Sequence, residues 1–158
     1  MPIEIERKYL VRDSSFLEGL QGTLYRQGYL SSSPEDLTVV RVRTAGPKAY
    51  LTIKSATRGI VRSEYEYEIP LDEAAEMLDH LCRPPLIEKT RYEIECAGYI
   101  WEVDVFAGDN QGLIVAEIEL ESEEQKFDLP PWIGDEVSHE PRYFNFNLAQ
   151  NPYKNWKE

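Results

Sequence analysis

The chain has 158 residues, of which 42% are hydrophobic and 29% charged, a composition typical of a globular protein with its own core. The formal net charge of −12 excludes a general nucleic-acid or anionic-membrane binder, because the surface of such a protein is basic. No run of about 18 apolar residues provides a membrane-spanning helix, and the charged N-terminus predicts no secretory signal. Cys82 and Cys96 lack metal-ligand spacing, so they indicate reduced thiols and a cytoplasmic location.

The predicted elements begin with a strand that carries the segment Glu4-Ile5-Glu6-Arg7-Lys8. The two-residue period of a strand places Glu4, Glu6 and Lys8 on one face, and the apolar neighbours with Arg7 on the other. The two carboxylates then lie about 7 Å apart. This spacing suits carboxylates that hold one hard cation or a pair. A solvated strand face explains a single segment of this kind equally well, so the other strands must decide its meaning.

Turn residues and alternating patterns divide the rest of the chain into seven further strands and a few helices. The strands are expected at Leu24–Leu30, Leu37–Thr44, Lys48–Ser55, Val61–Ile69, Leu86–Cys96, Tyr99–Phe106 and Gly112–Leu120. A helix is expected at Asp72–Cys82, before Pro84-Pro85, with shorter helical turns within Asp13–Leu17, Ser122–Phe127 and Asn147–Gln150. Ser31–Asp36 and Asp128–Gly134 are expected to be loops. The pattern predicts a mainly β (α+β) protein, an antiparallel barrel or sandwich in one domain over residues 1–158.

Charged side chains fall in phase on one face of these strands. The basic ones are Lys8, Arg41, Arg43, Lys54, Arg62, Lys89 and Arg91, and the acidic ones are Glu4, Glu6, Glu64, Glu66, Glu68, Glu102, Asp104, Glu117 and Glu119. In a sandwich these faces would be wet, but pairs of one sign, such as Arg41 and Arg43, would repel each other without a counterion. In a barrel they would line a wide lumen filled with water, cations and an anion, because unpaired buried charge is very costly. The pattern alone leaves both arrangements open.

A set of motifs resembles the CYTH family, also called triphosphate tunnel metalloenzymes. The first is the ExExK signature at Glu4-Ile5-Glu6-Arg7-Lys8, and it is followed in order by six more blocks. These are Arg41-Val42-Arg43, Leu51-Thr52-Ile53-Lys54-Ser55, Arg62-Ser63-Glu64-Tyr65-Glu66, Glu88-Lys89-Thr90-Arg91-Tyr92, Glu102-Val103-Asp104-Val105-Phe106 and Ala116-Glu117-Ile118-Glu119. Arg142-Tyr143 followed by Asn145 resembles the family's C-terminal segment. The match is similar to the short, single-domain bacterial members.

The resemblance implies an eight-stranded antiparallel β-barrel that forms a tunnel with a charged lumen and helices packed outside. It also implies a divalent metal, Mg²⁺ or Mn²⁺, and a substrate that carries a linear triphosphate. Several Lys and Arg side chains suit such a substrate, because they offset its four to five negative charges in a confined site. All-oxygen ligands suit Mg²⁺ or Mn²⁺ better than zinc.

Residue roles follow from the matching motif positions. Lys8, Arg41, Arg43, Lys54, Arg62, Lys89 and Arg91 are expected to bind phosphate oxygens. Glu4, Glu6, Asp104, Glu117 and Glu119 are expected to bind metal, and Glu64 and Glu66 to support either set. Lys89 is expected to stabilise charge on the leaving oxygen, and Tyr29 to line the tunnel as a second catalytic residue or to pack beside Gly28. The expected reaction is metal-assisted in-line hydrolysis of a terminal phosphoanhydride.

The sequence leaves alternatives to a tripolyphosphate hydrolase, which could also accept nucleoside triphosphates. They are a class IV-type adenylate cyclase, a thiamine triphosphatase and a non-catalytic module that binds polyphosphate or nucleotides. The expected partner is a small-molecule triphosphate, with no nucleic acid and no membrane, and a homodimer is left open. Neither a P-loop nor a Rossmann motif is present, and His80 and His139 have no partner at ligand spacing.

Overall fold

The computed structural model describes residues 3–30, 38–55 and 59–156. Within them the strands are β1 (Ile3–Val11), β2 (Thr23–Tyr29), β3 (Thr38–Ala45), β4 (Lys48–Ser55), β5 (Val61–Ile69), β6 (Ile87–Cys96), β7 (Tyr99–Phe106), β8 (Ile114–Glu119) and β9 (Ile133–Glu136). The α-helices are α1 (Leu71–His80) and α2 (Asn145–Gln150), and single 3₁₀ turns occur at Ser15–Leu17, Gly108–Asn110, Pro141–Tyr143 and Tyr153–Asn155. Among the described residues no helix is long and apolar enough to cross a membrane.

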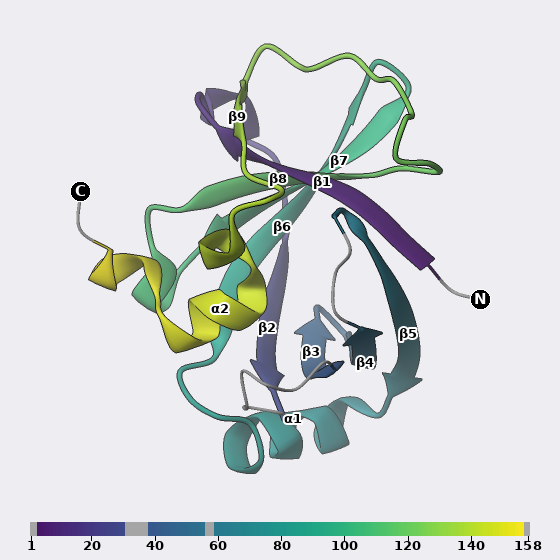
Figure 1. Ribbon diagram of the computed structural model, residues 1–158. Helices are drawn as coiled ribbons and strands as arrows, with labels where there is room; N and C mark the ends of the chain where they lie inside the picture. The colour runs from purple at the N-terminus through teal and green to yellow at the C-terminus, as the bar shows by residue number, and fades with distance from the viewer. Residues whose placement is uncertain (1–2, 31–37, 56–58, 157–158) are drawn as a thin grey trace.

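The strands form a closed antiparallel barrel in the order β5-β4-β3-β2-β6-β7-β8-β1. β1 closes it, because Glu6–Leu10 pairs with β8 on one side while Ile3–Ile5 pairs with β5 on the other. In Figure 1, β1 crosses the molecule between β9 and β8 at one end and the start of β5 at the other. The expected eight-stranded antiparallel barrel is therefore confirmed, and the sandwich is excluded.

Tight hairpins join several of these strands and set their register. Ala45 pairs with Lys48, so the β3–β4 turn has only two central residues, Gly46 and Pro47. Gly46 has a φ of +59°, the left-handed conformation that such a turn needs at its first central position. This register keeps Arg41, Arg43 and Lys54 on the inner face of the barrel, where they line its cavity.

The apolar core lies outside the barrel, between the outward faces of the strands and the segments that cover them. α1 covers β3 and β4, where its Ala74 and Leu78 pack against Val42 and Ala49. In Figure 1 this helix lies below β2, β3 and β4. The acidic residues in its first turn suit the positive end of the helix dipole.

Two more apolar clusters cover the rest of the outer face. Trp101 of β7 is fully buried among Tyr9, Phe127 and Trp132, so the segment after β8 packs on β1 and β7. Near the C-terminus, Tyr143 and Leu148 pack with residues of β6, β7 and β8. Burial of large apolar side chains on this outer layer is the main source of the barrel's stability.

Several sequence-based boundaries differ from the structure. α1 starts and ends slightly earlier than predicted, and 122–127 contains a turn in place of a helix. Part of the loop predicted at 128–134 is instead the start of β9, which pairs with β1 at a bulge between Tyr9 and Val11. β9 has only four residues, too few for a recognisable alternation. The loop predicted at 31–36 lies outside the described residues.

Candidate active site

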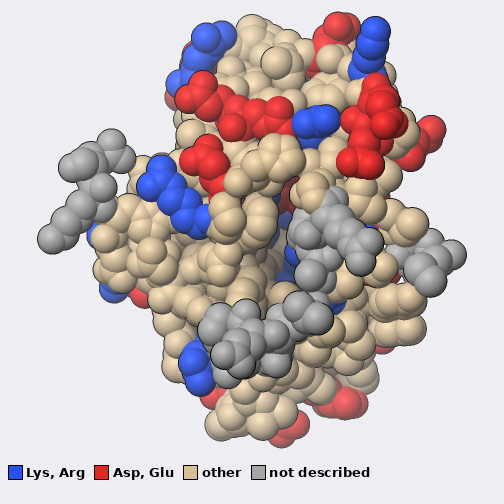
Figure 2. All heavy atoms as spheres, viewed as in Figure 1, with Lys and Arg blue, Asp and Glu red and all other residues tan. Residues whose placement is uncertain are grey.

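The barrel encloses a cavity of about 500 Å³ whose wall is dominated by charged side chains. All the predicted site residues except Asp104 line it: Glu4, Glu6, Lys8, Tyr29, Arg41, Arg43, Lys54, Arg62, Glu64, Glu66, Lys89, Arg91, Glu117 and Glu119. Figure 2 shows Lys and Arg atoms inside the central hollow of this face, while Asp and Glu gather on the outer surface above it. A chain of net negative charge therefore carries a local concentration of positive charge in its interior.

Two guanidinium groups and a threonine converge on one carboxylate in the part of the cavity formed by β3, β4 and β5. Arg43 Nη2 lies 3.2 Å and Arg41 Nη2 3.5 Å from Glu66 Oε2. The hydroxyl of Thr52 donates to the same oxygen over 2.8 Å. A single carboxylate thus occupies a position between two arginines, where an anionic substrate group would also be attracted.

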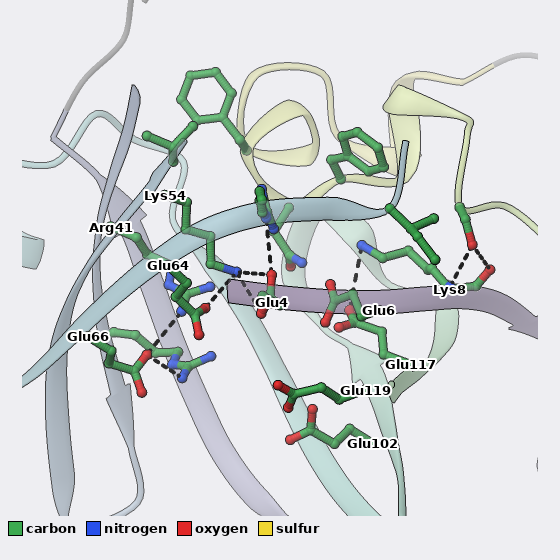
Figure 3. Close-up of a pocket in the computed structure, with 18 of the residues that line it drawn as sticks. Glu4, Glu6, Lys8, Arg41, Lys54, Glu64, Glu66, Glu102, Glu117 and Glu119 are labelled. Carbon is green, nitrogen blue, oxygen red and sulfur yellow. Dashed lines mark hydrogen bonds and ion pairs between the residues drawn. The ribbon is translucent and has the colours of Figure 1, made fainter. Parts of the chain in front are cut away.

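Glu4 lies between a lysine and an arginine (Figure 3). Its Oε1 is 3.2 Å from Lys54 Nζ and 3.1 Å from Arg62 Nε. Burial alone would raise the pKa of Glu4, but the charges of Lys54 and Arg62 outweigh it and lower the pKa to about 2. Lys54 Nζ also lies 3.2 Å from Glu64 Oε2. The two carboxylates and two cations form one network, buried at Glu4 and Lys54 and partly exposed at Arg62 and Glu64, in which Glu4 is ionised.

A separate acidic group is formed by Glu6, Glu102, Glu117 and Glu119, whose carboxylates lie on the same side of the cavity in Figure 3. Burial and the charges of Glu117 and Glu4 raise the pKa of Glu6 well above its ordinary value. Burial would also raise the pKa of Glu117, but Lys8, Arg91 and Lys89 together hold it well below the usual range. Two neighbouring carboxyl groups are therefore shifted in opposite directions: burial and nearby carboxylates favour the protonated form of Glu6, while nearby cations favour the ionised form of Glu117.

Asp104 lies behind the cavity wall, where it holds two cations. It accepts hydrogen bonds from Lys89 Nζ at 2.8 Å and from Arg91 Nε and Nη2 at 2.7 and 2.9 Å. Lys89 is only 1% exposed, and this burial lowers its pKa to about 8 despite the attraction of Asp104. Lys89 is therefore charged at neutral pH, and one carboxylate, that of Asp104, holds both Lys89 and Arg91.

The C-terminal segment supplies part of the cavity wall that the strand pattern did not predict. Phe144, Asn145, Phe146 and Asn147, at the start of α2, all line the cavity. Lys8 Nζ donates to the carbonyl oxygen of Tyr143 at 3.3 Å, and Lys89 Nζ lies 3.3 Å from Asn145 Oδ1. The only sequence signal for these contacts was the resemblance of Arg142, Tyr143 and Asn145 to a family segment.

Ser138 is a second contribution that the sequence did not indicate. The backbone N–H of Lys8 donates to Ser138 Oγ at 2.9 Å, and this hydroxyl donates to Glu136 at 2.6 Å. The N–H of Val137 also donates to the carbonyl oxygen of Lys8 at 2.8 Å. The residues at and after β9 thus fix the backbone of β1 at Lys8.

Tyr29 lines the cavity and is also buried against protein. Its hydroxyl accepts a hydrogen bond from Gln27 Nε2 at 3.1 Å, and its ring meets Phe146 edge-on at 5.1 Å. Burial raises the pKa of Tyr29, so its hydroxyl keeps its proton at neutral pH. The neighbouring Gly28 has no side chain, which lets Leu86 and Cys82 approach the backbone of β2 closely. A Cβ at position 28 would lie 2.7 Å from Leu86 and 2.8 Å from Cys82.

The carboxylate oxygens around the cavity are of the kind that binds hard divalent cations. Glu6, Glu117 and Glu119 offer only oxygen atoms, which are the ligands that such a cation prefers. Among the described residues no three or more His, Cys, Asp or Glu side chains are already grouped at metal-binding geometry. His80 and His139, both exposed, take no part.

The chain is similar to several known proteins. The CYTH domain model matches residues 2–153. A curated relative from Acetivibrio thermocellus, named inorganic triphosphatase, is 51% identical over 155 residues, which cover 98% of each chain. Another inorganic triphosphatase, from Nitrosomonas europaea, is 41% identical over 92% of this chain and 96% of its own. A crystal structure of an inorganic triphosphatase has a TM-score of 0.67 and 38% identity, and covers 94% of this chain and 95% of its own. The chain belongs to the CYTH domain family.

Proposed function

We propose that this protein is a divalent-metal-dependent triphosphatase that hydrolyses a phosphoanhydride bond of a linear triphosphate, inorganic tripolyphosphate above all. The observation that carries the proposal is the barrel cavity, in which cations from β1, β3, β4, β5 and β6 surround one space beside a group of carboxylates. The proposal is further supported by the names of the relatives, which are inorganic triphosphatases at 51% and 41% identity. The whole of residues 1–158 acts as one domain in this proposal.

The cations bind the phosphate chain. Arg41 and Arg43 converge on the position that Glu66 Oε2 fills, and Lys54 and Arg62 converge on Glu4. Lys8, Lys89 and Arg91 complete the set from β1 and β6. Charge-assisted hydrogen bonds from so many donors offset the charge of a triphosphate in this confined site.

The carboxylates hold the metal, which we propose to be Mg²⁺ or Mn²⁺. Glu6, Glu117 and Glu119 share one side of the cavity, and Glu4 lies on the same face of β1 as Glu6. When bound, the ion supplies positive charge to phosphate oxygens and acidity to a water molecule. Asp104 bonds Lys89 and Arg91 with both oxygens, so we assign it to orienting these cations and, through water, to supporting the metal. Glu64 and Glu66 orient Lys54 and the two arginines.

The chain's own groups then perform an in-line displacement. A carboxylate of the acidic group accepts a proton from water as the water oxygen attacks the terminal phosphorus. The phosphorus–oxygen anhydride bond breaks on the opposite side, which releases orthophosphate and leaves pyrophosphate. Lys89, charged at neutral pH and fixed by Asp104, donates a hydrogen bond to the leaving oxygen. The protonated hydroxyl of Tyr29 donates to a phosphate oxygen from the cavity wall.

The test is a phosphate-release assay with tripolyphosphate, ATP and thiamine triphosphate, each with Mg²⁺, with Mn²⁺ and with a chelator. We expect rapid release of orthophosphate from tripolyphosphate that requires the metal. Cyclic AMP and pyrophosphate from ATP would instead identify a cyclase. Tight binding of tripolyphosphate with Mg²⁺ but without phosphate release would identify a binding module.

Two further assignments accompany the proposal. Cys82 and Cys96 carry no disulfide, which agrees with a cytoplasmic location. The partner in this proposal is the small-molecule triphosphate, and a homodimer would have twice the molar mass of the chain in solution.

A further inference from the structure

Three of the cavity's cations approach the ring of one tyrosine that is not among the residues lining the cavity. The guanidinium carbon of Arg91 lies 4.9 Å from the ring centroid of Tyr25, and that of Arg43 lies 5.1 Å away. Lys89 Nζ lies 6.0 Å from the same centroid. Each distance is within the range in which a cation is attracted to an aromatic ring. The ring is therefore shared by cations from two different strands.

The position of Tyr25 in the barrel explains this contact. β2 lies between β3, which carries Arg43, and β6, which carries Lys89 and Arg91. Tyr25 pairs directly with Lys89, while Arg91 lies diagonally opposite on β6 and Arg43 diagonally opposite on β3. Long side chains at direct and diagonal positions on one face of a sheet can touch. The register of two strand pairs therefore brings the three cations to one ring.

The three cations carry like charge and share one ring, so they repel one another. For Arg43, burial together with the charges of Arg41 and Arg91 lowers the pKa. Asp104 and Glu66 offset part of the repulsion by forming ion pairs, but a carboxylate also cancels the positive charge that a phosphate needs. The face of an aromatic ring attracts a cation without adding a negative formal charge. A ring behind the cations therefore restrains them while leaving their charge available to the cavity.

We propose that Tyr25 is a positioning residue that holds Arg43, Lys89 and Arg91 in place for the phosphate chain through the face of its ring. The inference rests on the proposed function, since it assigns these cations to phosphate binding. Tyr25 acts through the cations and does not touch the substrate. Its loss is expected to weaken binding more than chemistry, because Lys89 and Arg91 keep their bonds to Asp104.

The experiment compares Tyr25→Phe, which keeps the ring, with Tyr25→Leu, which removes it. Tyr67→Leu is the matched control, because Tyr67 is 57% exposed and lies on the alternate, outer face of β5. For each variant, kcat and KM for tripolyphosphate are measured with Mg²⁺, and binding of tripolyphosphate is measured by calorimetry without metal. We expect Tyr25→Leu to raise KM and the metal-free Kd about tenfold, with kcat changed about twofold at most. Tyr25→Phe and Tyr67→Leu should stay near the wild type.

A series of fluorinated phenylalanines at position 25 tests the ring face at nearly constant shape. Each added fluorine weakens the negative face of the ring, so KM should rise stepwise along the series, which a purely structural role would not produce. The inference is overturned if KM is the same along the series, or if Tyr25→Phe is as impaired as Tyr25→Leu. A wild-type protein that neither binds nor hydrolyses tripolyphosphate would overturn the proposed function itself.

Discussion

The inside and the outside of this barrel differ in the kind of interaction that they contain. The inner face holds ion pairs such as Lys89–Asp104 and Arg62–Glu4, whereas the outer face holds apolar clusters built around residues such as Trp101 and Leu78. Buried ion pairs contribute little net stability because desolvation offsets their attraction, while apolar burial contributes about 25 cal/mol per Å². Stability and the proposed function therefore depend on opposite faces of the same strands, so substitutions can separate them.

The largest effect is expected on the outer face. Trp101→Ala should lower the free energy of unfolding by about 3–5 kcal/mol, because it leaves a cavity in the middle of an aromatic cluster. Urea unfolding followed by circular dichroism measures this loss. Below the unfolding transition, kcat per folded molecule should remain within about twofold of the wild type, since Trp101 is outside the lumen. A large loss of kcat in the folded variant would contradict the separation of the two faces.

On the inner face, Lys89→Ala should lower kcat by about 100- to 1000-fold, because it removes the proposed donor to the leaving oxygen. The phosphate-release assay measures the loss of kcat. Lys48→Ala is the control, because Lys48 is an exposed lysine at the start of β4. Glu4→Gln should also abolish most turnover while the circular dichroism spectrum stays unchanged. Activity close to the wild type in either variant would refute the assigned roles.

Also on the inner face, removing one carboxylate of the acidic group should stabilise the protein without metal but weaken its stabilisation by metal. Glu6→Gln is expected to stabilise the metal-free protein at pH 7.5 by about 1–2 kcal/mol, because it removes a carboxylate placed beside Glu117 and Glu4. The pKa of Glu6 is raised on folding, so its ionisation destabilises the fold as pH rises through the folded pKa. The stability gained by Glu6→Gln should therefore vanish below about pH 4.5, the pKa of this glutamate in the unfolded chain. Thermal melts between pH 4 and pH 8 measure it.

The same variant provides its own control with metal. Mg²⁺ should raise the Tm of the wild type but not that of Glu6→Gln, since the variant lacks one of the proposed ligands. An equal increase in both proteins would show that Glu6 is not a ligand, whatever the metal-free result.

The smallest effect is expected for Arg7, which lies on the opposite face of β1 from its neighbour Lys8. Arg7 points outward to Glu136 at 2.8 Å, whereas Lys8 points into the cavity and lies 3.5 Å from Glu117. Arg7→Ala should cost about 1 kcal/mol of stability at most, because the pair is partly exposed, and should leave KM unchanged. Lys8→Ala should raise KM for tripolyphosphate at least tenfold. Equal KM values in the two variants would contradict the assigned alternation.

Much of this arrangement could be predicted from the alternation of side chains. The two-residue period placed Arg41 with Arg43, and Glu4 with Glu6 and Lys8, on common faces, and each of these residues lines the cavity. The pattern could not decide whether that face turned inward or outward, because both arrangements satisfy the same alternation. The resemblance to the CYTH family favoured the inward arrangement, and the pairing of β1 with both β5 and β8 confirms the closed barrel.

The rest could not be predicted because it depends on contacts between distant segments. Asp104 alternates in phase with Glu102, yet Lys89 and Arg91 cover it, and no local pattern reveals such a cover. Asn145 and its neighbours reach the cavity from outside the strands, so no strand period applies to them. The contacts of Tyr25 arise only from the registers of β2 with β3 and β6.

The closure of the barrel by β1 also has a consequence for biosynthesis. The partners of β1 lie near residues 61–63, 115–119 and 133–136, so β1 is synthesised well before the segments with which it pairs. Contacts so far apart along the chain form late and slow the search for the native state. During translation Glu6 and Lys8 therefore stay separated from their partners on β8, and a nascent chain has no assembled tunnel in which to trap cellular polyphosphate or its counterions.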